Sequence, residues 1–456
     1  MKIWPFSSQA QRITTYERSQ KGVERVDFEK LATQDQLQLS LAPVTSDQLQ
    51  EKLKQLKSDQ AVSPPVARDV TVNPGSVLMG YDSQDPVSLD YIAQVALVGK
   101  VEGFSVLAAA RPEELGKAQR KLSSQAADNT TWLANPGGHD SWVEDHGEFS
   151  QTGEVVIPAI LPADSDDIED WVIRGRRDRY HVMAEQGQPR PRADYAMLGL
   201  VNRRQAQEGM VNVALASGAS QVKLAVSYVE GGNMLTGQRA DGSPFALVGK
   251  DSLAVTGRLL PKGADEAAAR AQVAKDYGLQ PEQVVAVEQP GDFHIDMAMS
   301  LAGPGQVMLN DSRKVLDLQK GWLNQHYANR WLHKDELPGE LEAVQKRAER
   351  QAVYEDVAEK ELRAAGLEVF RVAGCFPKTG ANPEMNFLNL RQGTNEQGEI
   401  FAIALGGEER AEKAFAETLL GEIPSGYHRI HFLDRKLTAE TLRFKGGIKC
   451  RTKIRL

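Results

Sequence analysis

The sequence has few cysteines and no long hydrophobic run. Its 456 residues include only Cys375 and Cys450, too few for a disulfide framework and typical of a reducing compartment. No apolar run approaches the roughly 20 residues that a membrane-spanning helix needs. Residues 1–8 lack the apolar segment and small-residue cleavage site of a secretory signal peptide. We therefore expect a cytoplasmic protein, or one exported without such a signal, as a bacterial effector would be, and no membrane partner.

Basic residues are also in the minority, which argues against nucleic acid as a partner. The formal net charge is −8, whereas a dedicated nucleic-acid binder shows a basic excess. Hydrophobic residues make up 41% and charged residues 25% of the chain, close to the average of globular proteins, which excludes a largely disordered chain. The length allows two or three ordinary domains, or one large domain with an extension.

A polar composition separates residues 1–76 from the rest. They are rich in Gln, Ser, Lys and Asp, and a helical stripe over residues 46–56 is followed by a linker at Pro64-Pro65. We predict a polar, partly helical N-terminal extension and linker here. It is either weakly packed or used to dock on the main domain, on a partner or on a chaperone.

Short apolar runs alternate with helical stretches from residue 77 to residue 456, which predicts an α/β class. No repeat is visible by identity, so any internal symmetry must lie in the structure. The expected strands are residues 104–110, 221–229, 283–287 and 399–405. The expected helices are one that opens at residue 111 and those over residues 264–277 and 408–419.

Residues 446–456 alternate in the manner of a strand. Ile448, Cys450 and Thr452 share one expected face, and Lys449 and Arg451 share the other. We expect Cys450 to point inward after a pair of glycines, with the flanking cations stabilising its thiolate, the nucleophilic form. The alternative is a buried structural cysteine on a basic edge strand.

A histidine and a carboxylate come together in residues 291–299. If this segment is a strand, His294 and Asp296 share one face. An imidazole beside a carboxylate suits proton transfer coupled to the binding of a cationic group. A histidine and an aspartate at this spacing also occur often by chance.

Paired glycines follow a carboxylate after the strand expected at residues 221–229. The order Glu230, Gly231, Gly232, Asn233 allows a tight turn or the close approach of a ligand. Glu230 could orient a histidine, or it could be a solvated acid at a turn.

Acidic side chains surround one tryptophan in residues 140–149. Trp142 stands beside Glu144, Asp145 and Glu148. This combination suits recognition of a cation, and a planar guanidinium takes bidentate carboxylate contacts well. An acidic surface loop is the alternative.

Together and in this order, the four motifs resemble those of the guanidino-group-modifying enzymes, the pentein superfamily, over roughly residues 77–456. The segments Trp142-Val-Glu-Asp-His-Gly-Glu-Phe149 and Cys450-Arg-Thr-Lys-Ile-Arg455 are similar to segments of protein-arginine deiminases. Glu230-Gly-Gly-Asn233 and Asn382-Pro-Glu-Met-Asn-Phe-Leu-Asn389 are closer to agmatine deiminases. The resemblance implies one catalytic domain over residues 77–456, built as a five-bladed α/β propeller of ββαβ-like units around a pseudo-fivefold axis.

The resemblance also implies roles for the motif residues. Cys450 would attack the guanidinium carbon and form a covalent thiouronium. His294 would protonate the departing ammonia and then activate water, with Glu230 orienting it. Two carboxylates would clamp the guanidinium nitrogens. They are those of Asp145 and Asp296, and the remaining expected substrate-binding residues are Trp142, Gly232 and Asn233.

Some positions depart from the family pattern or stand outside it. Lys449 stands where the family usually has histidine, although strand alternation would place it on the opposite face from Cys450. Glu148 matches a calcium-binding glutamate of protein-arginine deiminases, but no full ligand set is present, so we expect neither calcium nor another cofactor. Arg174 could hydrogen-bond backbone carbonyls of a peptide substrate or lie in a solvated basic loop. Cys375 is expected to be a small core residue.

The favoured activity is hydrolysis of peptidyl-arginine to citrulline and ammonia. The partner would then be an arginine-containing protein or peptide. The alternatives are a deiminase of agmatine or free arginine, an amidinotransferase that passes the amidino group to an amine, and an arginine-binding protein without catalysis.

Overall fold

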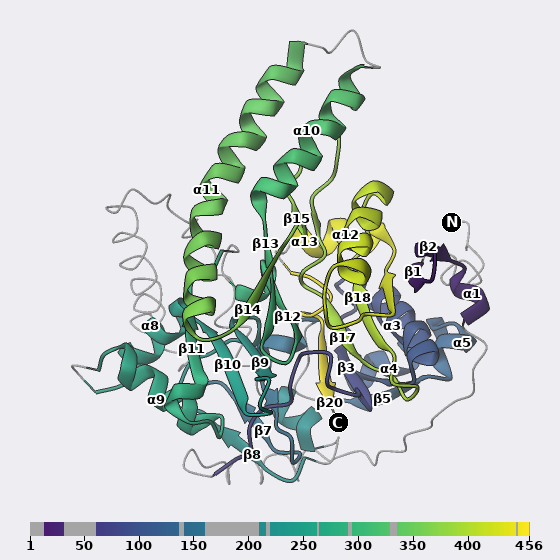
Figure 1. Cartoon of the computed structure of the whole chain (residues 1–456). Helices are drawn as coiled ribbons and strands as arrows, with labels where there is room; N and C mark the ends of the chain where they lie inside the picture. Colours follow the sequence, from purple (N-terminus) through teal and green to yellow (C-terminus); the bar gives the residue numbers. More distant parts are fainter. Residues whose placement is uncertain are drawn as a thin grey trace.

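The computed structural model (Figure 1) describes residues 13–31, 61–135, 141–159, 209–215, 219–261, 264–290, 294–328, 335–443 and 446–455. The helix expected over residues 46–56 and the candidate Arg174 lie outside these ranges. Within them, no helix combines the length and the apolar character needed to span a membrane.

Five of the six described sheets repeat one strand pattern. In each, an antiparallel pair is extended by a strand that runs parallel to its neighbour. Parallel neighbours need a crossover connection, usually a helix. This requirement explains why helical and strand-like stretches alternate along the sequence.

The strands of these sheets come from distant parts of the chain. The first sheet has the order β20 (Thr452–Arg455), β3 (Ser76–Gly80), β4 (Ser105–Ala110) and β5 (Thr130–Ala134). The second has β6 (Glu148–Phe149), β7 (Val155–Ile157) and β8 (Val222–Leu224). The third has β11 (Val284–Val287), β10 (Pro244–Gly249) and β9 (Met234–Gln238). The fourth has β12 (Met299–Gly303), β13 (Gln306–Asn310) and β14 (Glu368–Val372), and a separate ribbon pairs β15 (Cys375–Phe376) with β16 (Met385–Asn386). The fifth has β17 (Arg391–Thr394), β18 (Ile400–Ala404), β19 (Arg429–Phe432), β1 (Thr14–Ser19) and β2 (Gly22–Val26).

Helices connect the parallel strands. They are α3 (Ser88–Glu102), α4 (Pro112–Lys121), α5 (Ser124–Ala127), α8 (Lys250–Leu259), α9 (Glu266–Asp276), α10 (Ser312–Ala328), α11 (Leu337–Ala364) and α12 (Glu409–Gly421). Two further helices are α1 (Phe28–Leu31), which follows β2, and α13 (Arg435–Arg443), which precedes β20. Strands β3 and β4 are buried along their whole length, as expected for parallel strands covered on both faces.

Most of the elements expected from the sequence are confirmed, with shifts of a residue or two at their ends. They are strands β4, β11 and β18 and helices α4, α9 and α12. Helix α4 begins at a proline after an extended residue, and the side chain of Asp265 caps α9 by accepting a hydrogen bond from the Ala268 backbone at 2.8 Å. The strand expected over residues 221–229 is shorter, because only Val222–Leu224 pairs with β7.

The beginning of the described chain is part of the fifth sheet. Strand β1 pairs with β19 on one side and with β2 on the other. The Thr15 hydroxyl is buried and lies 2.9 Å from Nδ1 of His431 on β19. Residues 14–26 therefore belong to the folded body and not to a weakly packed extension. The domain boundary at residue 76 stays a prediction.

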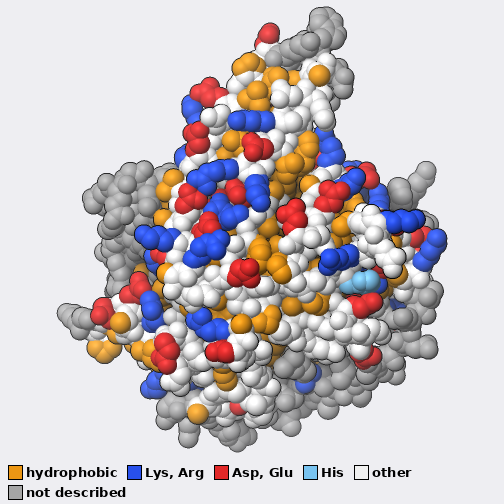
Figure 2. All heavy atoms as spheres, in the orientation of Figure 1, with side chains coloured by type: hydrophobic (Ala, Val, Ile, Leu, Met, Phe, Trp, Pro, Cys, Tyr) orange, Lys and Arg blue, Asp and Glu red, His pale blue; other side chains and the backbone are white. Residues whose placement is uncertain are grey.

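Helices α10 and α11 form a hairpin that projects from the body of the molecule (Figure 1). Apolar side chains hold the two helices together, among them Leu323 and Tyr327 of α10 and Val344 of α11. On the face shown in Figure 2, acidic and basic side chains are interspersed over this hairpin. The hairpin is thus an amphipathic pair whose apolar stripe is largely used internally.

Candidate active site

Cys450 lies in a turn just before β20 and not in a strand. Hydrogen bonds from Arg451 N to Ile448 O and from Thr452 N to Lys449 O close the turn, at 3.2 and 3.1 Å. The expectation of a strand from residue 446 is therefore wrong. The two expected faces do not exist, because Lys449, Cys450 and Arg451 are all buried.

The side chain of Asn389 holds this turn. Its Oδ1 accepts from the backbone N–H groups of Lys449 and Cys450, at 2.9 and 3.4 Å. Its Nδ2 donates to Cys450 Sγ at 3.3 Å. A Cβ on Gly447 would come within 2.3 Å of Asn389 Oδ1, which explains the need for glycine there. Asn389 ends the segment Asn382–Asn389 that is similar to agmatine deiminases, but its contact with Cys450 could not be expected from the sequence.

The surroundings of Cys450 favour the thiol over the thiolate. Burial raises its pKa well above the ordinary value, and the charges of Asp296 and Asp145 raise it further. The expectation that flanking cations stabilise the thiolate of Cys450 is therefore wrong. Arg451 instead forms an ion pair with Asp85.

His294 precedes the short helix η7 (Ile295–Met297), so the strand expected around it is absent. Its Nε2 is hydrogen-bonded to Glu230 Oε2, and its Nδ1 lies 3.9 Å from Asp145 Oδ1. Burial lowers the pKa of His294, but the carboxylates of Asp145 and Glu230 outweigh this effect and raise the pKa above its usual value. The imidazole is therefore prepared to carry a proton near neutral pH.

Glu230 is in turn supported by Tyr228. The Tyr228 hydroxyl donates to Glu230 Oε1 at 2.9 Å, while the other carboxylate oxygen binds His294. This arrangement fixes the orientation of the imidazole.

The paired glycines of η5 (Gly231–Asn233) allow this close approach. A Cβ on Gly232 would lie 2.2 Å from His294 Nδ1, and one on Gly231 would lie 1.8 Å from the Glu144 carbonyl oxygen. Gly232 N–H donates to Asp145 Oδ1 at 3.0 Å, and Asn233 Oδ1 accepts from the Ile295 backbone at 3.2 Å. Gly232 and Asn233 therefore connect η5 to the two neighbouring site segments.

Replacing Gly232 by alanine is expected to lower kcat by about 10²-fold, because the added methyl group displaces His294 and misplaced catalytic groups cost rates of this order. Steady-state ammonia release measures the effect. Gly321→Ala in α10 is the matched control, since nothing lies within 4 Å of the added Cβ. Full turnover by the Gly232→Ala variant would contradict the assigned position of His294.

The thiol and the imidazole each lie close to one carboxylate. Asp296 is fully buried and its Oδ2 is 3.8 Å from Cys450 Sγ. Asp145 lies in η3 (Val143–His146), is 14% exposed, and has an oxygen 3.9 Å from His294 Nδ1. Burial raises the pKa of Asp296 above its ordinary value and outweighs the opposing charges of Lys449 and His294. The thiol and the imidazole thus each contact one member of the same acidic pair.

Trp142 packs on a side chain of the protein itself. The Arg451 guanidinium lies 4.6 Å from the Trp142 ring centroid and 4.7 Å from that of Tyr91. Trp142 also packs against the apolar group that contains Cys450. The ring therefore helps to fix Arg451 and the turn that carries Cys450.

A buried ionic cluster that the sequence analysis missed lies beside these residues. Glu144 forms ion pairs with Arg68 and Arg391 and lies 3.5 Å from Lys453 Nζ, while Glu148 pairs with Arg68 and Lys453. Glu144 and Glu148 are therefore used by internal cations and not by a substrate cation, as was expected of this acidic segment. Arg68 follows Pro64-Pro65 in a segment with the composition of a linker, so the sequence around it does not predict such a role.

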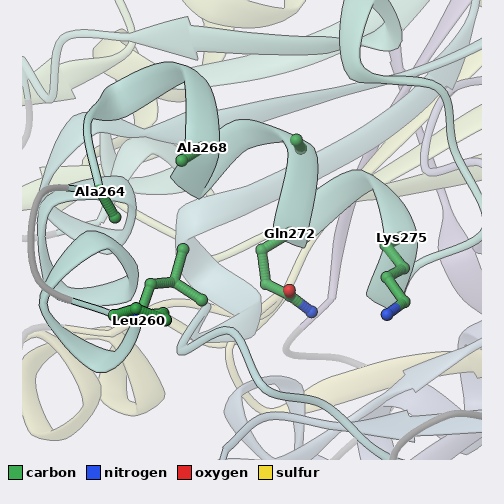
Figure 3. Close-up of a pocket in the computed structure, with 7 residues that line it drawn as sticks. Leu260, Ala264, Ala268, Gln272 and Lys275 are labelled. Carbon is green, nitrogen blue, oxygen red and sulfur yellow. The ribbon is translucent and has the colours of Figure 1, made fainter.

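Two surface hollows of about 540 Å³ each lie apart from this group. One is lined by residues of α9 and of the segment between α8 and α9, including Leu260, Ala268 and Gln272 (Figure 3). The other adjoins α9, β11 and α11. Neither is lined by a residue of the group around Cys450.

Comparisons with known proteins support the fold. No family model matches the sequence, and no curated protein matches it. Among solved structures, the chain is similar to a candidate agmatine deiminase, with a TM-score of 0.53 and 13% identity over 86% of this chain and 95% of that chain. The chain is less similar to agmatine deiminase of Enterococcus faecalis (TM-score 0.46, 13% identity, 87% of this chain and 99% of that chain covered) and to DDAH of Pseudomonas aeruginosa (TM-score 0.32, 11% identity, 84% and 100% covered). The likeness to the candidate agmatine deiminase thus supports a mixed α/β fold.

Proposed function

We propose that this protein hydrolyses a guanidinium group to a ureido group and ammonia through a covalent intermediate on Cys450. The observation that carries the proposal is one buried group built from separate segments. Cys450 Sγ lies 3.8 Å from Asp296, and His294 lies 3.9 Å from Asp145 and is bound to Glu230. A thiol, an imidazole and two carboxylates are the groups that attack on a planar cation requires.

The first step is binding of the guanidinium between Asp145 and Asp296. The positive charge offsets the two acids that raise the Cys450 pKa, so the thiol gives its proton to solvent more readily in the complex. The thiolate attacks the guanidinium carbon and forms a tetrahedral adduct. A proton from His294 then allows the C–N bond to break with release of ammonia, leaving a thiouronium on sulfur.

The second step is hydrolysis of the thiouronium. Neutral His294 accepts a proton from a water molecule, whose oxygen attacks the same carbon. The C–S bond then breaks, the remaining proton of the former water passes from the new carbonyl oxygen to the sulfur, and the ureido product leaves. Glu230 keeps the imidazole aligned through both proton transfers.

The favoured substrate is arginine within a peptide or protein, on the strength of the two segments similar to protein-arginine deiminases. The proposal also includes closure of the five repeated sheets around one axis, action without calcium or another cofactor, and a partner-docking role for the N-terminal extension apart from the segments that belong to the folded body. Agmatine or free arginine, amidino transfer to an amine, and binding without catalysis are the alternatives that the assay must separate.

The test is an assay of the full chain with an arginine-rich protein, free arginine and agmatine, each with EDTA or with added calcium. We expect ammonia and protein-bound citrulline, at equal rates in both conditions. Carbamoylputrescine or free citrulline as the main product would reassign the substrate. Transfer of the amidino group without ammonia would indicate an amidinotransferase, and binding without any product would indicate a non-catalytic arginine binder.

A further inference from the structure

Arg68 is a buried arginine in the segment before β3, and this segment is fixed by its backbone. Arg68 is 6% exposed. Its N–H donates to the Thr236 carbonyl of β9 at 2.7 Å, and its carbonyl accepts from the Gln392 side chain of β17 at 2.9 Å. Two residues earlier, Val66 N–H donates to the Phe149 carbonyl of β6 at 2.8 Å. Three of the repeated sheets therefore hold the segment, whichever side chain stands at position 68.

The Arg68 guanidinium contacts two segments of the candidate site at once. Its Nη1 donates to the carbonyl oxygens of Gly231 and Met234, at 2.9 and 2.7 Å. These two residues are the first of η5 and the one directly after η5. The same guanidinium forms ion pairs with Glu144 of η3 and with Glu148, two residues beyond η3. One side chain thus bridges η3 and η5.

The two bridged segments carry the groups on either side of His294. Glu144 is followed on η3 by Asp145, whose Oδ1 lies 3.9 Å from His294 Nδ1. Glu230 directly precedes η5 and is hydrogen-bonded to the other ring nitrogen, Nε2. Gly232 N–H of η5 donates to Asp145 Oδ1 at 3.0 Å. The spacing of η3 and η5 therefore controls the distance between Asp145 and the imidazole.

Each of these contacts of the Arg68 side chain is made with a hydrogen-bond acceptor. Two carbonyls and two carboxylates repel one another when they are buried without a donor between them. A guanidinium offers five donors in a planar fork, whereas the ammonium of a lysine offers three from a single atom. Glu144 and Glu148 outweigh burial and raise the pKa of Arg68 above its ordinary value, so the side chain keeps its charge. A lysine at this position would keep the charge and lose the bridge.

We propose that Arg68 is a positioning residue that acts through η3 and η5: its guanidinium holds the two segments together and so fixes Asp145 at its distance from His294. The use of this spacing in catalysis rests on the proposed function, whereas the spacing itself does not. A segment with the composition of a linker thereby determines the geometry of the acid and the imidazole that would face a bound guanidinium.

The first experiment measures the protonation of His294 without any substrate. Asp145 of η3, Glu230 before η5 and Asp296 of η7 face the imidazole and raise its pKa against the effect of burial. In Arg68→Lys we expect η3 to move away from η5. The titration midpoint of His294 should then fall by about half a pH unit or more, because the attraction of Asp145 weakens with distance. NMR of protein labelled with ¹³C at histidine Cε1 measures the midpoint, and the signal absent from His294→Gln identifies the residue.

Arg429→Lys is the matched control. Arg429 is also buried, on β19, where it forms ion pairs with Glu102 and Glu17, neither of which belongs to η3 or η5. This variant likewise removes a guanidinium and keeps the charge, so it should leave the His294 midpoint unchanged. An equal fall in both variants would reflect a general loosening of the fold and would overturn the proposal.

Kinetics of the same two variants give the catalytic readout. Because Asp145 binds the substrate and also faces His294, Arg68→Lys is expected to raise KM and to lower kcat by about tenfold each. The alkaline limb of kcat/KM against pH should move to lower pH together with the His294 midpoint, since ammonia release needs protonated His294. Arg429→Lys should keep kcat, KM and this limb at their wild-type values. An unmoved limb in Arg68→Lys would contradict the proposal.

The outcomes separate the inference from the proposed function. An unchanged His294 midpoint in folded Arg68→Lys overturns the positioning role and leaves the hydrolase proposal standing. If the wild type forms no product but Arg68→Lys lowers the midpoint, the hydrolase proposal fails and the positioning role is retained. Should Arg68→Lys not fold, Glu148→Asp decides by the same criterion, because it keeps every charge and withdraws one partner of the guanidinium by one methylene.

Discussion

The Cys450→Ala variant is expected to lose more than about 10³-fold in turnover, since no covalent intermediate can form without the thiol. It should still bind a guanidinium compound, because Asp145 and Asp296 remain in place. Ammonia release measures the loss, and calorimetry measures the retained binding.

The second cysteine provides the matched control. Cys375 lies on β15, where its Sγ donates to the Met297 carbonyl oxygen at 3.2 Å. Cys375→Ala should therefore keep turnover. Full activity in Cys450→Ala, or loss of activity only in Cys375→Ala, would show that Cys450 is not the nucleophile.

Alkylation of the wild type tests the protonation state of the same sulfur. Because the Cys450 pKa is raised in the empty site, neutral iodoacetamide should label it slowly at pH 7. A cationic haloacetamidine should label it faster, since its charge favours the thiolate as a substrate would. Equal rates for the two reagents would show that the acidic pair does not control the thiol.

The chemical identity of the candidate site could be predicted from sequence better than its local backbone. Cys450, His294, Asp145 and Glu230 were singled out by residue type and spacing, and the fold brings them together. Residues 446–456 were expected to be one strand because apolar and basic residues alternate there. A turn stabilised by tertiary contacts produces the same alternation, and the contacts from Asn389 and Arg391 are not visible in a local pattern.

The fivefold repetition of the strand pattern could not be predicted from the residues themselves. The pattern is kept by backbone pairing, which tolerates almost any apolar side chain on a buried strand. Arg68 was missed for a related reason. It lies in a segment with the composition of a linker, and only the folded chain places it against Glu144 and Glu148.

That ionic cluster leads to the largest expected effect on stability. Glu144 is fully buried and is the acid shared by Arg68, Arg391 and Lys453. Glu144→Gln leaves these cations with Glu148 as their remaining acid in the cluster. Because an uncompensated buried charge costs about 3–5 kcal/mol, the free energy of unfolding should fall by this amount. Chemical denaturation of the two proteins at pH 7 measures the difference. Glu342→Gln is the control, because its pair with Lys346 is exposed and should contribute nothing measurable.

The pH dependence of this difference distinguishes a charge effect from a packing effect. Burial opposes ionisation of Glu144, but Arg391 and Arg68 outweigh it and lower the pKa to about 2. A carboxyl whose folded-state pKa is depressed contributes its stability above the unfolded-state pKa, near 4.5, and loses it as the pH falls toward 2. The gap between wild type and Glu144→Gln should therefore be constant from pH 7 to about pH 5 and then narrow. If the stability difference stays constant down to pH 3, the glutamine acts by disturbing packing and not by removing a charge.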